Sequence, residues 1–107
     1  MSRTKVTLCR LDDLADGGAR RFDVDGRSLA VVRIGDDVYA IGDRCSHANI
    51  SLSEGDVHAD ERELECWKHG STFDLETGKP RTLPATVPVQ VFPVKIEGDD
   101  VMIEVDG

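Results

Sequence analysis

Two short segments of the chain each offer one thiol and one imidazole. The first holds Cys45 and His47, and the second holds Cys66 and His69. Thiolates and imidazoles are transition-metal ligands, so the two segments predict a metal site. A single structural zinc ion is usually held by paired cysteines and paired histidines. Here each segment mixes the two types, which favours two neighbouring metal ions, one bound by both cysteines and the other by both histidines.

Beyond these pairs, the chain resembles the Rieske-type ferredoxins of bacterial aromatic-ring-hydroxylating oxygenase systems. The resemblance runs from about Lys5 to Val105. It includes the motifs that follow the two ligand pairs, Leu52-Ser53-Glu54-Gly55 and Phe73-Asp74-Leu75-Glu76-Thr77-Gly78. It implies one Rieske-type [2Fe-2S] cluster. A zinc knuckle, or a chance clustering of small residues, is the alternative interpretation.

The same resemblance assigns the ligands. It implies that Cys45 and Cys66 bind the inner iron, and that His47 and His69 bind the outer iron through their Nδ1 atoms. Two thiolates and two neutral imidazoles leave the oxidised cluster uncharged, whereas four thiolates would leave two negative charges. Rieske potentials therefore lie at about −150 to +300 mV, against about −400 mV for four-cysteine ferredoxins.

Several residues near the ligands are expected to surround the cluster. Ser71 stands where high-potential relatives place a serine hydroxyl on a bridging sulfide, although a turn residue is the alternative. Phe73 replaces a tyrosine hydroxyl of those relatives, so we expect a potential near the low end of the Rieske range. Trp67 is expected to shield the cluster, to join a docking surface or simply to pack. Pro84 belongs to segment 79–85, which matches the family's cover loop or is a plain connection.

The rest of the chain alternates apolar and polar residues with the period of β-strands. Asp25-Gly26 is a hairpin signal between strands expected at 21–24 and 28–34. Pro93 marks the strand expected at 89–96 as an edge strand or a bulged one. Further strands are expected at 6–9, 38–41, 64–65, 71–74 and 101–105. These patterns predict an all-β fold, and the resemblance implies that it is the Rieske fold, an antiparallel β-sandwich with a smaller cluster-binding subdomain.

The length and the net charge of the chain limit the number of domains and the kinds of partner that can be expected. A chain of 107 residues is expected to form a single domain, 1–107, with cluster-binding loops at about 43–54 and 64–86. The formal net charge of −8 argues against a nucleic-acid partner. Between Glu54 and Glu65 lie six acids and one arginine, which form either an ordinary solvated surface or one that steers a basic partner. We expect a monomer.

The start of the chain and its cysteines suggest the compartment. No signal peptide or membrane span is expected, because Met1 leads into an alternating stretch and not into an apolar run. Cys9 lies in a strand pattern and is expected to be a small buried hydrophobe. With Cys45 and Cys66 assigned as ligands, no disulfide is expected, and the cytoplasm is the predicted location.

The number of histidines in the chain indicates whether it could be an oxygenase or only an electron carrier. An oxygenase subunit would also need a mononuclear iron site with two histidines and a carboxylate. Once His47 and His69 are assigned, only His58 remains, and it is expected to be a solvated loop residue. The chain is therefore not expected to be an enzyme.

The resemblance implies a soluble one-electron carrier between a flavoprotein NAD(P)H reductase and a terminal non-haem iron oxygenase. One alternative is a small Rieske subunit of another redox system, such as a nitrite reductase or an accessory of iron–sulfur assembly. Another is a structural zinc-binding module.

Overall fold

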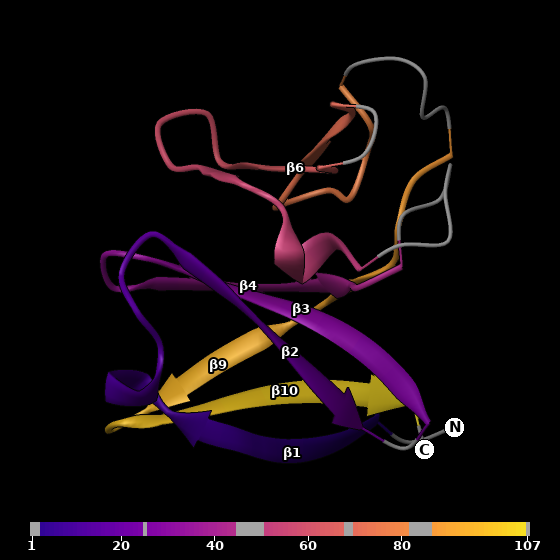
Figure 1. The fold of residues 1–107 in the computed structure, drawn as a ribbon. Coiled ribbons are helices and arrows are strands. Elements are labelled where there is room, and N and C mark those ends of the chain that lie inside the picture. The colour runs from indigo at the N-terminus through magenta and orange to yellow at the C-terminus, as the bar shows by residue number, and fades with distance from the viewer. Residues whose placement is uncertain (1–2, 25, 45–50, 68–69, 82–86, 107) are drawn as a thin grey trace.

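The computed structural model describes residues 3–24, 26–44, 51–67, 70–81 and 87–106. These residues form three antiparallel sheets and two 3₁₀ turns (Figure 1), which confirms the expected all-β fold. The 3₁₀ turns are η1 (Leu11–Asp13) and η2 (Leu52–Glu54). The strands are β1 (Arg3–Arg10), β2 (Gly18–Val24), β3 (Arg27–Ile34), β4 (Asp37–Gly42), β5 (Val57–His58), β6 (Glu63–Glu65), β7 (Thr72–Asp74), β8 (Val91–Phe92), β9 (Val94–Glu97) and β10 (Asp100–Asp106).

The two larger sheets pack face to face as a sandwich. One sheet has the strand order β1-β10-β9 and the other has the order β2-β3-β4-β8. The expected hairpin between β2 and β3 turns through Gly26, whose φ of 78° suits glycine, while Asp25 lies outside the described residues. Val101, Ile103 and Val105 of β10 are buried in the core between the sheets.

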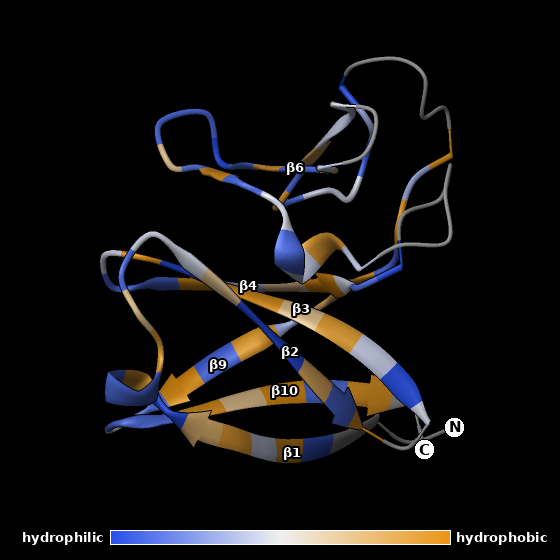
Figure 2. Ribbon diagram, viewed as in Figure 1, coloured by the Kyte–Doolittle hydropathy of each residue, from blue (hydrophilic) through white to orange (hydrophobic). Residues whose placement is uncertain are grey.

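Strand β3 contributes to two cores at once. Leu29 and Val31 belong to the core of the sandwich, whereas Ala30 and Val32 belong to a second core on the opposite face of the same sheet. Because successive side chains of a strand point to opposite faces, a strand buried on both sides shows a continuous apolar run. Figure 2 shows this apolar colour along the middle of β3.

The second core supports the third sheet, which has the order β5-β6-β7. Leu52 of η2, Leu64 of β6 and Phe73 of β7 are fully buried in it, together with Ala30 and Ile41 of the neighbouring sheet. In Figure 1 this small sheet sits on the side of β2-β3-β4 opposite to β1 and β10. It is the expected smaller subdomain, and its β6-β7 hairpin carries Cys66.

The segment around Pro93 differs from the expectation. The sequence predicts one strand over 89–96, but the structure has β8 and β9 on either side of Pro93. They lie at the edges of different sheets, with β8 paired to β4 and β9 paired to β10. Proline lacks the amide hydrogen that a ladder needs. The edge position is thus confirmed, whereas the single strand is wrong.

Candidate metal centre

The first candidate ligand loop leaves β4 at a buried carboxylate. Asp43 is 2% exposed, and its amide donates to the carbonyl of Ser28 at 3.0 Å. Its Oδ1 accepts from the Ser53 amide at 2.9 Å, and its Oδ2 accepts from the Ser51 hydroxyl. The Asp43 carbonyl also accepts from the Leu52 amide at 2.5 Å. A single residue thereby holds the returning end of the loop against its departing end.

An isolated bridge between Arg44 and Ser51 reinforces this closure. Cys45 and His47, the two ligands predicted for this loop, lie outside the described residues. The structure therefore places the two ends of their loop next to each other, at the edge of the second core, where Leu52 is fully buried.

The second candidate loop joins β6 to β7. Above the register pair Glu65 and Thr72, the Cys66 amide donates to the Ser71 carbonyl at 2.7 Å, and the Gly70 amide donates to the Cys66 carbonyl at 2.9 Å. Gly70 has a φ of 76°, which a side chain would disfavour. The loop that contains Cys66 is thus a tight turn on a hairpin. His69 lies outside the described residues.

A close backbone contact fixes the two loops relative to each other. Gly55 follows η2, and a Cβ placed on it would lie 1.7 Å from the carbonyl oxygen of Glu65. The Glu65 amide also donates to the Asp56 carbonyl at 2.8 Å. The motif that follows the first loop therefore packs directly against the strand that leads into Cys66. This contact explains the glycine at position 55.

A third segment lies alongside the hairpin. Pro80 forms an isolated bridge with Phe73, and the Arg81 amide donates to the Thr72 carbonyl at 2.7 Å. Gly78 is equally constrained, with a φ of 75° and a hypothetical Cβ 2.1 Å from the carbonyl oxygen of Val89. Pro84, predicted to cover the cluster, lies outside the described residues.

The carboxylate of Asp74 organises the turn after β7. Its Oδ1 accepts from the amides of Glu76 at 2.7 Å and Thr77 at 3.0 Å, while its Oδ2 accepts from Arg81. Burial alone would raise the pKa of the Asp74 carboxyl. The hydrogen bonds from Arg81 and from the two amides outweigh that effect and hold the pKa below its usual value.

The structure describes one predicted ligand, Cys66, and three of the residues that were expected to surround the cluster. Cys66 and Ser71 are fully buried, at the two ends of the hairpin loop. Trp67 is 53% exposed, so its side chain is not packed into either core. Phe73 is buried in the second core.

The chemistry of the predicted ligands can be compared with that of the metal group they would bind. Among the described residues there is no cluster of three or more histidines, cysteines or acids that could bind a metal. Cys66 is the one predicted ligand that the structure describes, and its side chain is fully buried where the loop leaves β6. Cys45 and His47 precede it in the sequence as one mixed pair, and His69 completes the second pair. Two thiolates with two imidazoles fit a [2Fe-2S] cluster of the Rieske type.

The predictions for His58 and Cys9 meet different outcomes. His58 is not a solvated loop residue, because it lies in β5, pairs with Glu63 and has its Nε2 3.1 Å from Glu65 Oε1. A two-residue strand has too little sequence pattern to be recognised. Cys9 is partly buried and packs against the sandwich core, and burial raises the pKa of its thiol.

Three important polar residues gave no signal in the sequence. The side chains of Asp43, Asp74 and Arg81 contact partners that lie two to 22 positions away in the sequence, and neither spacing nor residue type distinguishes them from surface charges. Gly55 and Gly78, in the motifs that follow the two ligand pairs, are the sequence signal that could have indicated close backbone contacts.

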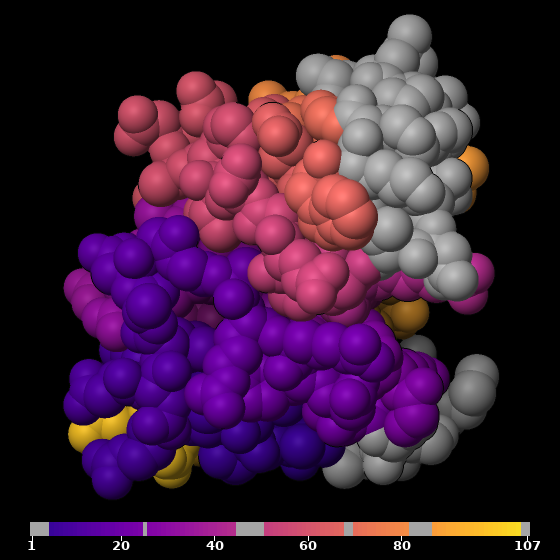
Figure 3. Space-filling view, viewed as in Figure 1, coloured from indigo at the N-terminus to yellow at the C-terminus, as the bar shows by residue number. Residues whose placement is uncertain are grey.

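The acids between Glu54 and Glu65 do not form one uniform surface. Glu63 and Glu65 are partly buried and make internal contacts with Arg81 and His58. Asp56, Asp60 and Glu61 are exposed. Figure 3 shows the lobe formed by this segment and η2, resting on the surface of β2 and β3.

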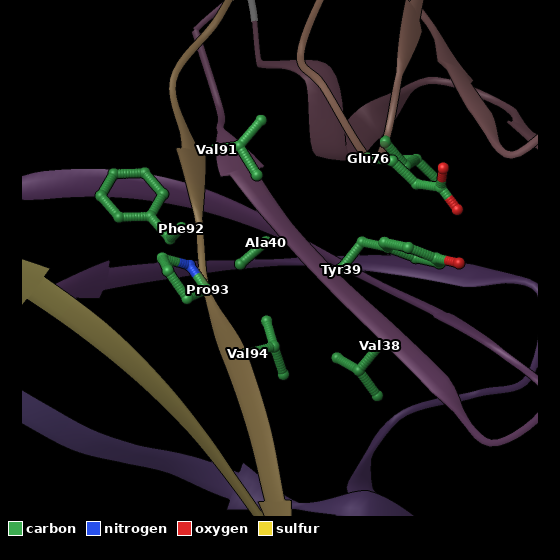
Figure 4. Close-up of a pocket in the computed structure, with 9 residues that line it drawn as sticks. Val38, Tyr39, Ala40, Glu76, Val91, Phe92, Pro93 and Val94 are labelled. Atoms are coloured by element: carbon green, nitrogen blue, oxygen red, sulfur yellow. The ribbon is translucent and has the colours of Figure 1, made fainter.

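An apolar groove of about 240 Å³ lies where the chain passes from β8 to β9. Figure 4 shows Val38 and Ala40 on one side of it, Phe92 and Val94 on the other, and Glu76 near its rim. It follows from the break at Pro93, because the chain leaves the edge of β4 there. Separately, no described helix is long and apolar enough to cross a bilayer.

Comparison with known proteins gives a consistent result. Residues 4–93 match the family described as the Rieske [2Fe-2S] domain. The ferredoxin component of biphenyl 2,3-dioxygenase from Rhodococcus jostii (strain RHA1) is 41% identical over 107 residues, which cover 100% of this chain and 96% of that protein.

Two solved structures have similar folds. The ferredoxin of carbazole 1,9a-dioxygenase from Nocardioides aromaticivorans IC177 is 43% identical with a TM-score of 0.91, covering 94% of this chain and 96% of that one. A chain in the complex of reduced oxygenase and oxidized ferredoxin in carbazole 1,9a-dioxygenase is 39% identical with a TM-score of 0.85, covering 92% and 91%.

Proposed function

Because the chain belongs to the Rieske [2Fe-2S] domain family, we propose that it is a one-electron carrier that serves a terminal non-haem iron oxygenase. The observation that carries this proposal is the similarity, over nearly the whole chain, to proteins named as ferredoxins of aromatic-compound dioxygenases. One of the similar structures is a complex of a ferredoxin with its oxygenase. The family assignment leaves the zinc-module alternative without support.

We propose that Cys45 and Cys66 bind one iron and that His47 and His69 bind the other. When bound, the cluster accepts and donates a single electron at a time. The polypeptide holds the ligands in place: Asp43 closes the first loop, and Gly70 allows the tight turn of the second. Burial of Cys66 keeps water from one of the proposed cluster ligands.

The proposal extends to the parts around the ligands. We infer one domain over residues 1–107, with cluster-binding loops at about 43–54 and 64–86. Ser71 would lie beside the cluster and Pro84 over it, while the exposed Trp67 would contact a protein partner. No substrate site of its own is proposed, so the carrier would not be an enzyme.

The partners follow from the role. A flavoprotein NAD(P)H reductase would supply the electrons, and a terminal oxygenase would receive them. We place the carrier in the cytoplasm, where the nicotinamide cofactor of such a reductase is kept reduced.

Two cysteine variants test the ligand assignment. Cys66→Ser should abolish iron and acid-labile sulfide, and with them the electron paramagnetic resonance signal of the reduced protein. Cys9→Ser is the matched control, because Cys9 lies in β1 against the sandwich core, and it should keep all three. A Cys66→Ser protein with full iron and an unchanged spectrum would contradict the proposal.

The carrier role needs a separate test. The purified protein should restore electron flow from a ferredoxin reductase to a Rieske oxygenase in a mixture of the separate components. Copurification with a nitrite reductase large subunit, and no transfer to any oxygenase, would favour the other redox alternative.

A further inference from the structure

Two carboxylates face each other at the base of the hairpin that carries Cys66. Glu63 of β6 and Asp74 of β7 are register partners, and their side chains are only 13% and 12% exposed. Like charges directly opposite each other on neighbouring strands destabilise the pair. Partial burial makes the repulsion stronger, because water screens it less. The hairpin therefore needs a counter-charge at this position.

Arg81 supplies that charge from the third segment. Its Nε lies 3.1 Å from Glu63 Oε2 and 3.1 Å from Asp74 Oδ2, and its Nη2 lies 2.6 Å from Asp74 Oδ2. Its own backbone is bonded to β7, through the amide that donates to the Thr72 carbonyl. The guanidinium is thus delivered from a fixed position and contacts both strands of the hairpin.

These contacts can affect the geometry of the ligand loop, because only a short hairpin separates them from it. Strands β6 and β7 have three residues each, so the pair Glu63 and Asp74 closes a ladder whose other end leads into Cys66 and Ser71. So short a ladder has few hydrogen bonds of its own to resist separation of the strands. Any opening at its base would be passed on to the loop.

We propose that Arg81 is a positioning residue of the metal centre: its guanidinium joins the facing carboxylates of Glu63 and Asp74 and so fixes the loop that begins at Cys66. This inference rests on the proposed function, because it concerns the geometry of the proposed cluster ligands. The planar fork of arginine can bind two carboxylates at once, whereas a lysine ammonium is a point charge on a flexible stem.

The test compares four variants as cluster-loaded proteins: Arg81→Gln, Arg81→Lys, Glu63→Gln, and the double variant Glu63→Gln/Arg81→Gln. One measurement is the rate of iron loss to a ferrous chelator after reduction. The other is the line width of the electron paramagnetic resonance spectrum, which reports the spread of ligand geometries and does not follow global stability. Arg10→Gln is the matched control, because Arg10 makes a 3.1 Å contact with Asp99 at the exposed end of the sandwich.

We expect Arg81→Gln to lose iron about tenfold faster and to broaden the spectrum, since hydrogen bonds between charged groups are worth about that factor. The Arg81 side chain is 52% exposed, which argues against a larger effect. Arg81→Lys should fall between Arg81→Gln and the wild type. Glu63→Gln and Arg10→Gln should resemble the wild type.

The double variant distinguishes charge compensation from simple loss of a contact. Removing Glu63's charge along with the arginine relieves the repulsion, so the double variant should lose iron more slowly than Arg81→Gln and recover the narrower lines. The inference would be overturned by an Arg81→Gln protein with wild-type iron loss and line width. It would also be overturned if the double variant were no better than Arg81→Gln, including the case in which neither variant retains a cluster.

Failure of the proposed function would be seen in the wild-type protein and not in the comparison of variants. If the wild-type protein contained no iron or labile sulfide, the proposed metal centre would be rejected before any variant is compared. A wild-type protein with a normal Rieske spectrum, together with an unaffected Arg81→Gln protein, would leave the function intact and reject only the role of Arg81.

Discussion

The sandwich of the two larger sheets and the small sheet β5-β6-β7 are held together in different ways. In the sandwich, strands β1, β2, β3 and β10 have seven or eight residues and pair along most of their length. In the small sheet the strands have only two or three residues. Besides the second apolar core beneath it, its cohesion depends on a few buried polar groups and on backbones that touch each other at Gly55 and Gly78.

This difference shows where single residues matter. Apolar burial in the sandwich is shared among many side chains, so one smaller side chain removes a limited part of the whole. In the small sheet, one carboxylate or one glycine can hold a whole segment in place. The region that carries the chemistry therefore has the sparser set of contacts, and the sandwich serves as its rigid support.

The largest effect is expected at Gly55. In Gly55→Ala the new Cβ would meet the carbonyl oxygen of Glu65, a backbone atom that no side-chain rotation can move aside. We expect the free energy of unfolding to fall by about 3 kcal/mol or more, since overpacking against rigid atoms reaches this range, and cluster assembly to fail. Thermal unfolding and iron content measure the two effects.

The control for this substitution lies in the sandwich. A Cβ on Gly42, at the end of β4, would have its nearest neighbour at 3.8 Å, which is an ordinary contact. Gly42→Ala should therefore keep its iron and unfold close to the wild type. If Gly55→Ala behaves in the same way, the small sheet is more adaptable than its contacts indicate, and the contrast between the two regions is lost.

These contacts also explain which parts of the fold and of the candidate site could be predicted from the sequence alone. The alternation of Val6–Cys9, the hairpin signal at Gly26 and the apolar run of β3 are local patterns, and they were enough to predict an all-β fold, whereas the sandwich was implied by the family resemblance. The Cys and His spacing predicted the kind of metal centre for the same reason. Pro93 showed that the strand around it was unusual, but not that the chain changes sheets there, because that depends on the positions of β4 and β10.

The support of the candidate site could not be predicted in the same way. Asp43, Asp74 and Arg81 look like ordinary surface charges in the sequence, and their roles arise only when the folded chain brings their partners near. The continuous run Leu29-Ala30-Val31-Val32 could have indicated a strand buried on both faces, and hence a second core. The ligands themselves, apart from Cys66, lie outside the described residues, so their assignment stays a prediction.

A smaller effect, dependent on pH, is expected at Asp74. Its carboxyl has a lower pKa in the folded protein than its usual value. Its contribution to stability is thus fully present above the unfolded pKa of about 4, and it is lost as the pH falls through the folded pKa. Compared with Asp74→Asn, the wild type should be more stable by about 1.5 to 3 kcal/mol near neutral pH, which is typical of hydrogen bonds to charged groups.

Urea unfolding at pH 7 and near pH 3 measures this difference, which should shrink at the lower pH. Asp23 in the sandwich is the control. The pKa of its carboxyl is also lowered, chiefly by the hydrogen bond from the Ser28 hydroxyl, but the group is exposed to solvent. Asp23→Asn should therefore change stability far less. An Asp74→Asn difference that stays constant with pH would show that the carboxylate's charge is not what holds the turn.

The smallest effect is expected on the exposed face of the small sheet. Asp56, Asp60 and Glu61 are exposed to solvent and do not share the internal contacts of Glu63 and Glu65, so they are among the acids of this segment that can attract a basic partner. Replacing all three by their amides should slow reduction of a partner oxygenase roughly threefold to tenfold at low ionic strength. Stopped-flow absorbance measures the rate, and the deficit should vanish as salt screens the charges.

Three exposed acids of the larger sheets separate local steering from net charge. Changing Asp12, Asp36 and Asp100 to asparagine alters the total charge by the same amount, at positions on the sandwich and not on the small sheet. If steering is local, this second triple variant should react at nearly the wild-type rate. Equal slowing of both variants would assign the effect to overall charge, and the functional contrast between the two regions would then rest on the metal-binding loops alone.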